Sequence, residues 1–188
     1  METISLKLID KDLHISLLPR LEGTVFHLTT QGAYRQIEED GKIKHNKNKK
    51  FPLNTGSENS YGINHGYICL FNLKEKDKET INDTLLVYFF LEPFWFRKYY
   101  NNRTESKLVY LILDSKFHHL IIDSEKAKGS PYQHVPKTEC WIDNHIPLDY
   151  IEKAFIVDII NSAPKEPFSL AHHMLILEKQ KKQQITKL

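Results

Sequence analysis

The chain has 188 residues, of which 40% are apolar and 11% aromatic, and its formal net charge is +2. This balance excludes a disordered chain, which needs low hydrophobicity and high net charge. The longest apolar runs fall far short of the roughly 20 residues that span a bilayer, no secretory signal opens the sequence, and two cysteines cannot build a disulfide framework. We therefore expect one cytoplasmic domain over residues 1–188, with no membrane partner.

The first clear pattern is a strand followed closely by a helix. Residues 25–29 are typical of a short strand, and Thr30 is a suitable N-cap for the helix behind it. Tyr34 and Ile37 recur at helical spacing, and Gly41 is placed to end the helix.

A basic loop is expected over residues 42–50, where no acidic residue occurs. Its cationic side chains are Lys42, Lys44, Lys47, Lys49 and Lys50, together with His45. Runs of like charge usually repel one another and stay solvated. The alternative is contact with phosphate or nucleic acid, in which Lys47, Lys49 and Lys50 would bind the acceptor of a reaction.

The remaining elements are mostly strands. We expect strands at residues 67–71, 85–91, 108–113, 117–122, 139–142 and 156–160. The pair 108–113 and 117–122 is close enough to form a hairpin. Pro147 is placed to open a short helix, and residues 168–180 indicate a C-terminal helix within a basic tail at 165–188. Few helices and no strict βα alternation predict an α+β domain with mostly antiparallel sheet.

Several familiar sites are missing from the sequence. It has no glycine-rich phosphate loop, no dinucleotide-binding turn and no nucleophile elbow. Neither Cys69 nor Cys140 has the partner spacing of a zinc site. The adjacent pair His118 and His119 lies on an expected strand, where neighbours point to opposite faces. We therefore expect no metal.

Three segments carry the candidate chemistry. His27 and Thr29 share a face of the first strand, Ser60 and Tyr61 lie in the polar loop 55–62, and Glu139 begins a late strand. Each has an ordinary explanation when taken alone. His27 fits a satisfied strand histidine, Glu139 a surface acid, and the loop residues a turn.

In order, these segments resemble the ADP-ribosyltransferase superfamily. A strand with His27 and Thr29 runs into a helix ending at Asp40 and Gly41, which is similar to the opening of the DNA-modifying toxins and RNA 2′-phosphotransferases of that group. The strand that begins at Glu139 is followed by Ile-Pro-Leu at 146–148, similar to the final catalytic strand. The resemblance covers residues 24–72 and 130–160, and order and spacing carry it because every motif is short.

The resemblance to the histidine–tyrosine–glutamate branch implies a split β-sandwich of two small, mostly antiparallel sheets with a few flanking helices and NAD⁺ between them. His27 would hydrogen-bond a ribose hydroxyl, with Thr29 assisting nearby. Ser60 would lie in the cofactor-binding loop, and either Tyr61 or Tyr67 would stack on nicotinamide.

Glu139 would be the catalytic acid in this resemblance. Its carboxylate would stabilise the positive charge that develops on the ribose as nicotinamide leaves. Many members carry an acid or glutamine two residues before the glutamate, where this chain has Lys137. A lysine at this position should alter the choice of acceptor or abolish the catalytic function.

The implied function is an NAD⁺-dependent ADP-ribosyltransferase, a bacterial toxin or defence enzyme, with a nucleic acid or protein as acceptor. Two alternatives stay open. One is a nonenzymatic module that binds a nucleotide or a protein on the same fold, and the other is an RNA-cleaving toxin that uses paired histidines and the basic loop without NAD⁺.

Overall fold

The structure is a computed structural model that describes residues 1–9, 13–48, 60–88, 91, 107–127, 133 and 135–160. The strands are β1 (Glu2–Ile9), β2 (Val25–Thr30), β3 (Lys42–Lys44), β4 (Tyr67–Asn72), β5 (Lys107–Leu113), β6 (Glu139–Asp143), β7 (His145–Pro147) and β8 (Ile151–Ile160). The α-helices are α1 (Leu18–Leu21), α2 (Gln31–Asp40), α3 (Tyr61–His65) and α4 (Lys78–Tyr88). Shorter turns are the π-helix η2 (Leu13–Leu17) and the 3-10 helices η3 (Ser115–Leu120) and η4 (Leu148–Tyr150).

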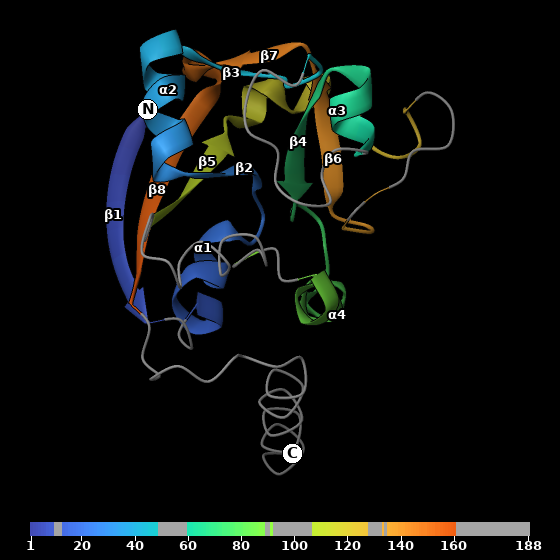
Figure 1. Cartoon of the computed structure of the whole chain (residues 1–188). Helices are drawn as coiled ribbons and strands as arrows, with labels where there is room; N and C mark the ends of the chain where they lie inside the picture. The colour runs from blue at the N-terminus through green and yellow to red at the C-terminus, as the bar shows by residue number, and fades with distance from the viewer. Residues whose placement is uncertain are drawn as a thin grey trace.

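Most of the strands form a six-stranded sheet in the order β1-β8-β5-β2-β4-β6 (Figure 1). Only β1 and β8 run parallel, and every other neighbouring pair in this sheet is antiparallel. The strands β3 and β7 form a separate antiparallel ribbon. The predicted α+β class with mostly antiparallel sheet is therefore confirmed.

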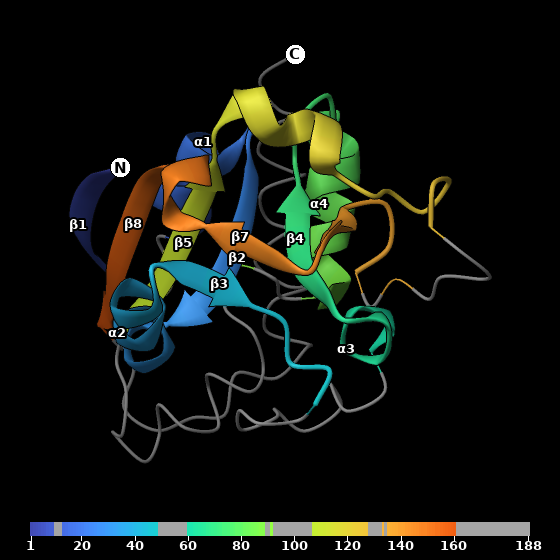
Figure 2. The ribbon, with the colours of Figure 1, turned by 90° about the horizontal axis from the view of Figure 1, so that it is seen from above.

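The large sheet has a hydrophobic core on each face, because the side chains of a strand alternate between faces. Leu108, Tyr110 and Ile112 of β5 belong to one core, together with residues of α1 and α4. The intervening residues of β5 belong to the other core, which is closed by Tyr34 and Ile37 of α2 and by the ribbon β3–β7. Figure 2 shows this ribbon lying across the sheet, with α4 on the far side.

The predicted strand–helix unit of β2 and α2 is confirmed by its caps. The hydroxyl oxygen of Thr30 accepts a hydrogen bond from the Ala33 N–H at 3.3 Å. Gly41 ends the helix with φ 66, in the left-handed region that costs glycine little. The strands expected at 67–71, 108–113 and 139–142 are also confirmed, within one residue at each end.

The strand expected at residues 85–91 is wrong, because α4 extends to Tyr88. Asp77 accepts a hydrogen bond from the Thr80 N–H at 2.7 Å, which stabilises the first turn. Ile81 and Leu85 follow at helical spacing, and both are buried in the core. The prediction considered only the apolar run 85–91, whereas the helix begins at Lys78, among the polar residues that precede this run.

The strand expected at 117–122 is also wrong, and with it the hairpin that it was to form with 108–113. The Asp114 side chain accepts the Lys116 N–H at 3.0 Å and starts the 3-10 turn η3, so His118 and His119 do not alternate across a strand. Only Ile122 pairs with a strand residue, Trp141, through an isolated bridge.

The first and last strands of the structure also differ from those predicted. β1 was not predicted, although Ile4, Leu6 and Leu8 alternate along it and pack on the core. Pro147 closes β7 and precedes a single 3-10 turn, η4, after which β8 begins earlier than expected. The helix expected at 168–180 lies outside the described residues. No described helix is long and apolar enough to cross a membrane.

Candidate functional site

The sequence-predicted residues lie on three neighbouring strands of the large sheet. β2 carries His27 and Thr29, β4 begins at Tyr67, and β6 begins at Glu139, and the strand order is β2-β4-β6. Tyr61 lies in α3, directly before β4. The fold therefore brings segments that are far apart in the sequence onto neighbouring strands (Figure 1), with Tyr67 and Glu139 at opposite ends of the antiparallel β4–β6 pair.

Glu139 is buried, with 4% of its surface exposed. One carboxylate oxygen, Oε1, accepts hydrogen bonds from the Trp141 indole N–H at 3.2 Å and the Cys69 thiol at 3.3 Å. The other, Oε2, accepts one from the Val135 N–H at 3.1 Å. The interpretation of Glu139 as a strand-edge surface acid is therefore wrong. A buried carboxylate needs such donors, because an isolated charge in the interior is costly.

A tight turn before β6 aims the Glu139 side chain. The Glu139 N–H donates to the Val135 carbonyl at 2.9 Å, which closes the turn. The Glu139 carboxylate in turn accepts the Val135 N–H at the start of the same turn. The Gln133 side chain donates to the Glu139 carbonyl at 2.6 Å. Lys137 is exposed at the tip of the turn, in the left-handed region at φ 63. Lys137, two residues before Glu139, is therefore a solvated turn residue.

Cys69 serves as a donor to this carboxylate. It lies opposite Trp141 in the β4–β6 register, so its side chain leaves the same face of the sheet. Burial raises the pKa of the Cys69 thiol well above its usual value, and the Glu139 carboxylate raises the pKa further. The thiol therefore keeps its proton at neutral pH and can donate it to Glu139.

A group of aromatic side chains packs beside the carboxylate. The ring centroid of Tyr61 lies 4.8 Å from that of Trp141, 4.1 Å from that of His65 and 5.9 Å from that of Tyr67. His65 and Tyr67 are stacked with centroids 5.8 Å apart. We call Tyr61, His65, Tyr67 and Trp141 the aromatic cluster. Within it, Tyr61 reaches Glu139 through Trp141, whereas Tyr67 lies at the other end of the β4–β6 pair, opposite Asp143.

The helix α3 is held against Trp141 by its first residues. The Ser60 hydroxyl oxygen caps α3 by accepting the Ile63 N–H at 3.3 Å. A Cβ at Gly62 would lie 3.2 Å from Cδ1 of Trp141, so the absence of a side chain at Gly62 permits this close approach. Ser60 thus has a clear structural role at the start of the helix that carries Tyr61.

His27 lies next to this site but on the other face of the sheet. Phe26 pairs with Phe71, and Phe71 with Glu139, which places these three on one face. His27 pairs with Leu111 and therefore projects from the opposite face, together with Thr29. The His27 imidazole nevertheless reaches β4, because its Nδ1 lies 2.9 Å from the carbonyl oxygen of Cys69.

The His27 contact exists because β2 and β4 separate. Their pairing covers only Val25 with Asn72 and Phe26 with Phe71. Beyond these pairs the two strands diverge (Figure 2), and the half-buried imidazole donates from Nδ1 to the Cys69 carbonyl. Burial lowers the pKa of His27 below its usual 6.5, while the hydrogen bond acts in the opposite direction. The imidazole is therefore neutral at physiological pH.

The structure thus links Tyr61 to Glu139 through Trp141. Tyr67 pairs with Asp143, at the other end of the β4–β6 pair from Glu139, and His27 and Thr29 lie on the opposite face of the sheet. Sequence reasoning did not name Trp141, Cys69 or His65 as site residues. Trp141 carried a usable signal, because a residue two positions after Glu139 on a strand shares its face. The partnership of Cys69 depends on strand pairing and had no local signal.

The predicted acceptor lysines are only partly described. Lys47 is exposed after β3, and its backbone N–H donates to Nδ1 of His45 at 3.1 Å. Lys49 and Lys50 lie outside the described residues. The expected loop begins later than predicted, since residues 42–44 form β3. Within the described part of the chain, no group of three or more His, Cys, Asp or Glu side chains could hold a metal ion.

Comparison of the chain with protein-family models, curated proteins and solved structures finds no match.

Proposed function

We propose that the protein is an NAD⁺-dependent ADP-ribosyltransferase, a cytoplasmic toxin or defence enzyme that transfers ADP-ribose to a nucleic acid or protein. The observation that carries this proposal is the Glu139 carboxylate, fixed by three donors beside an aromatic cluster. A fixed carboxylate can stabilise the positive charge that develops on the ribose as the nicotinamide–ribose bond breaks, and an aromatic surface can hold the nicotinamide ring.

The proposed reaction exchanges one glycosidic bond for another. The bond between the ribose and the nicotinamide nitrogen breaks, and nicotinamide leaves with the electron pair. A nucleophile of the acceptor then forms a bond to the same ribose carbon and loses its proton to solvent. Glu139 stabilises the positive charge that develops on the ribose, and a preorganised group of this kind typically contributes about 3–4 kcal/mol to the transition state.

The remaining residues position the substrate in this proposal. Tyr61 or Tyr67 stacks on nicotinamide, and an aromatic surface of this kind excludes water. His27, neutral near pH 7, orients a ribose hydroxyl without adding an opposing positive charge. Thr29 and Ser60 complete the cofactor-binding set. His27 and Thr29 would act from the side of the sheet opposite Glu139, where β2 and β4 separate.

We further propose that the fold is a split β-sandwich, divided between β2 and β4. These strands share only two pairs, whereas β2 and β5 share five and β4 and β6 share five. The weak pairing would let β1-β8-β5-β2 and β4-β6 act as two small sheets, with NAD⁺ held where they part.

One observation favours a second candidate, a nonenzymatic module that binds a nucleotide or a protein. Glu139 is only 4% exposed, and three protein groups donate hydrogen bonds to its two carboxylate oxygens. A carboxylate satisfied in this way can be purely structural. In that case the aromatic cluster and the basic residues of β3 would serve binding alone.

The experiment that separates these candidates uses NAD⁺ labelled on its adenylate part. Purified protein is incubated with the label and a cell lysate, and the nucleic-acid and protein fractions are scored separately. Label in either fraction, together with released nicotinamide, supports the transferase and identifies the acceptor class. Binding of NAD⁺ without release supports the binding module. RNA cleavage in the absence of NAD⁺ supports the RNA-cleaving alternative and contradicts the transferase.

A further inference from the structure

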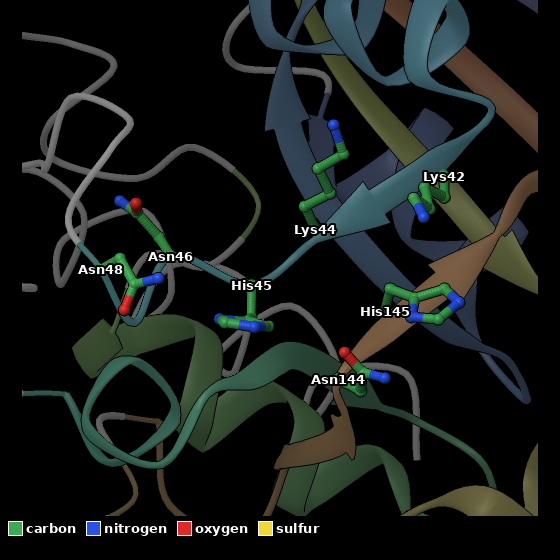
Figure 3. A pocket seen from close by; sticks show the side chains of 7 residues that line it. All are labelled: Lys42, Lys44, His45, Asn46, Asn48, Asn144 and His145. Carbon is green, nitrogen blue, oxygen red and sulfur yellow. The ribbon is translucent and has the colours of Figure 1, made fainter.

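A polar cavity of about 290 Å³ lies beside the ribbon β3–β7 (Figure 3). Its described lining consists of two lysines, two histidines and three asparagines. The side chains are Lys42, Lys44, His45, Asn46, Asn48, Asn144 and His145. All seven can donate hydrogen bonds. We call this cavity the basic pocket.

The ribbon builds the pocket by alternation. Ile43 pairs with Ile146, and both are buried in the core beneath the ribbon. The residues on either side of Ile43, Lys42 and Lys44, therefore point away from that core. Lys44 lies directly opposite His145 in the register, which brings a lysine and a histidine to one spot. The β3–β7 pairing therefore buries Ile43 and Ile146 and leaves Lys42 and Lys44 on the side of the ribbon that faces away from the core.

The charges of the pocket are only partly balanced. Lys44 forms an ion pair with Asp40 at 2.7 Å. Within the described residues, no carboxylate lies within ion-pairing distance of Lys42. Nδ1 of His45 accepts the Lys47 N–H, so a neutral His45 carries its proton on Nε2 as a donor. A site with surplus positive charge and many donors fits an oxyanion.

The pocket borders the aromatic cluster through Gly66. The Gly66 carbonyl accepts the Asn144 N–H at 3.3 Å. A Cβ at Gly66 would lie 3.2 Å from Cδ of Lys47 and 3.6 Å from Nδ1 of His45. Gly66 directly follows the exposed His65, which is stacked on Tyr67. A phosphate in the pocket would therefore have an aromatic surface nearby on which a base can stack.

We propose that the basic pocket binds the phosphate group of a nucleotide unit, with Lys42 and Lys44 as its charged contacts. Two ligands could supply this phosphate group: the phosphodiester backbone of a single-stranded nucleic acid and the pyrophosphate of NAD⁺. Phosphate binding needs no turnover, so the site stands apart from the proposed transferase activity. Failure of one leaves the other intact.

The test measures binding of three probes in the absence of any reaction: a labelled single-stranded oligonucleotide of about ten nucleotides, ADP-ribose and inorganic phosphate. The test variant is Lys42→Gln/Lys44→Gln. The matched control is Lys116→Gln/Lys126→Gln, which removes the same charge from two exposed lysines outside the pocket, each paired with an aspartate. Thermal unfolding of both variants verifies that the fold is kept.

If the phosphodiester is the source, the pocket variant should bind the oligonucleotide at least about tenfold more weakly at low salt, and the slope of log affinity against log salt should fall by about 0.7 for each lost phosphate contact. The control should change binding by less than about threefold. If ADP-ribose is affected and the oligonucleotide is not, the phosphate site belongs to the cofactor. Equal weakening in both variants, or unchanged binding of all three probes in the pocket variant, would overturn the proposal.

Discussion

The Glu139 site and the basic pocket differ in the sign, the burial and the hydrogen-bond partners of their charged groups. At Glu139 one negative group is buried, and its oxygens accept hydrogen bonds from three donors on different parts of the chain. In the pocket, several donors line a cavity; within the part of the chain that the structure describes, Lys44 is paired with Asp40 and no carboxylate lies within ion-pairing distance of Lys42. The donors to the buried carboxylate come from the protein itself, whereas the donors of the pocket are proposed to bind a phosphate group.

This difference indicates how substitutions in each region should affect stability and binding. Breaking one partner of a buried charged network costs stability, because the group left behind has lost its water and its partner. Removing one exposed charge costs little, because water replaces it. Substitutions near Glu139 should therefore affect folding and chemistry together, whereas substitutions in the pocket should affect binding alone.

The largest expected loss of stability follows truncation of Trp141, which is fully buried between Glu139 and Tyr61. Trp141→Ala should lower the free energy of unfolding by about 3–5 kcal/mol, because it leaves a cavity. Trp141→Phe keeps most of the ring and removes the indole N–H, and it should cost about 1.5–3 kcal/mol through the lost hydrogen bond to a charged group. Urea unfolding of both variants measures this. A loss below about 0.5 kcal/mol for Trp141→Phe would contradict the hydrogen bond to Glu139.

A smaller effect is expected from His27 on the acid side of neutrality. Burial lowers its folded-state pKa below 6.5, so the unfolded chain takes up the proton first as pH falls. The contribution of His27 to stability is present above pH 6.5 and is lost as pH falls through the folded-state pKa. His27→Gln should therefore flatten the decline in stability between about pH 7 and pH 5.

The matched control for His27 is His119→Gln, an exposed histidine whose Nδ1 lies 2.8 Å from the Lys116 carbonyl oxygen. Thermal midpoints across the pH range give the slopes. The control should keep the slope of the parent. A His27→Gln variant with the parent's slope would show that the His27 imidazole is not buried in its neutral form.

The smallest expected effect is that of the pocket lysines on stability. Lys42→Gln should change the free energy of unfolding by less than about 0.5 kcal/mol, as is usual for surface substitutions. Lys44→Gln also removes the ion pair with Asp40 and should cost about 0.3–0.5 kcal/mol. Denaturant midpoints check both values. A loss above about 1 kcal/mol would mean that the lysines hold the ribbon together, and the contrast with the Glu139 site would fail.

The parts of the fold that the sequence predicts are those determined by near neighbours. Thr30 and Gly41 cap α2 through contacts within a few residues, so the strand–helix unit could be located in advance. The start of α4 depends on Asp77, a polar residue outside the apolar run that suggested a strand. The turn at Asp114 likewise depends on one side-chain hydrogen bond, which apolar spacing does not reveal.

The candidate site shows the same division. Glu139 and the tyrosines were named from a resemblance in short motifs; the structure joins Tyr61 to Glu139 through Trp141 and places Tyr67 at the other end of the β4–β6 pair. The burial of Glu139 and its bond to Cys69 depend on the pairing of β4 with β6, two strands far apart in the sequence. The position of His27 on the other face depends on pairing as well. Single-sequence reasoning gives residue types and spacing, but strand order across a sheet has no local signature.

The most direct test of the account is Glu139→Gln, compared with Asp143→Asn, which changes an exposed acid on the same face of β6. Release of nicotinamide in a single turnover is measured beside a titration with NAD⁺, and only the folded fraction of each protein is counted. We expect Glu139→Gln to release nicotinamide at least about 10²-fold more slowly, with its affinity for NAD⁺ changed less than about tenfold, because the carboxylate acts on the transition state. Asp143→Asn should match the parent. Release by folded Glu139→Gln at the parent's rate would remove Glu139 from the chemistry and leave it as a structural carboxylate in a binding module.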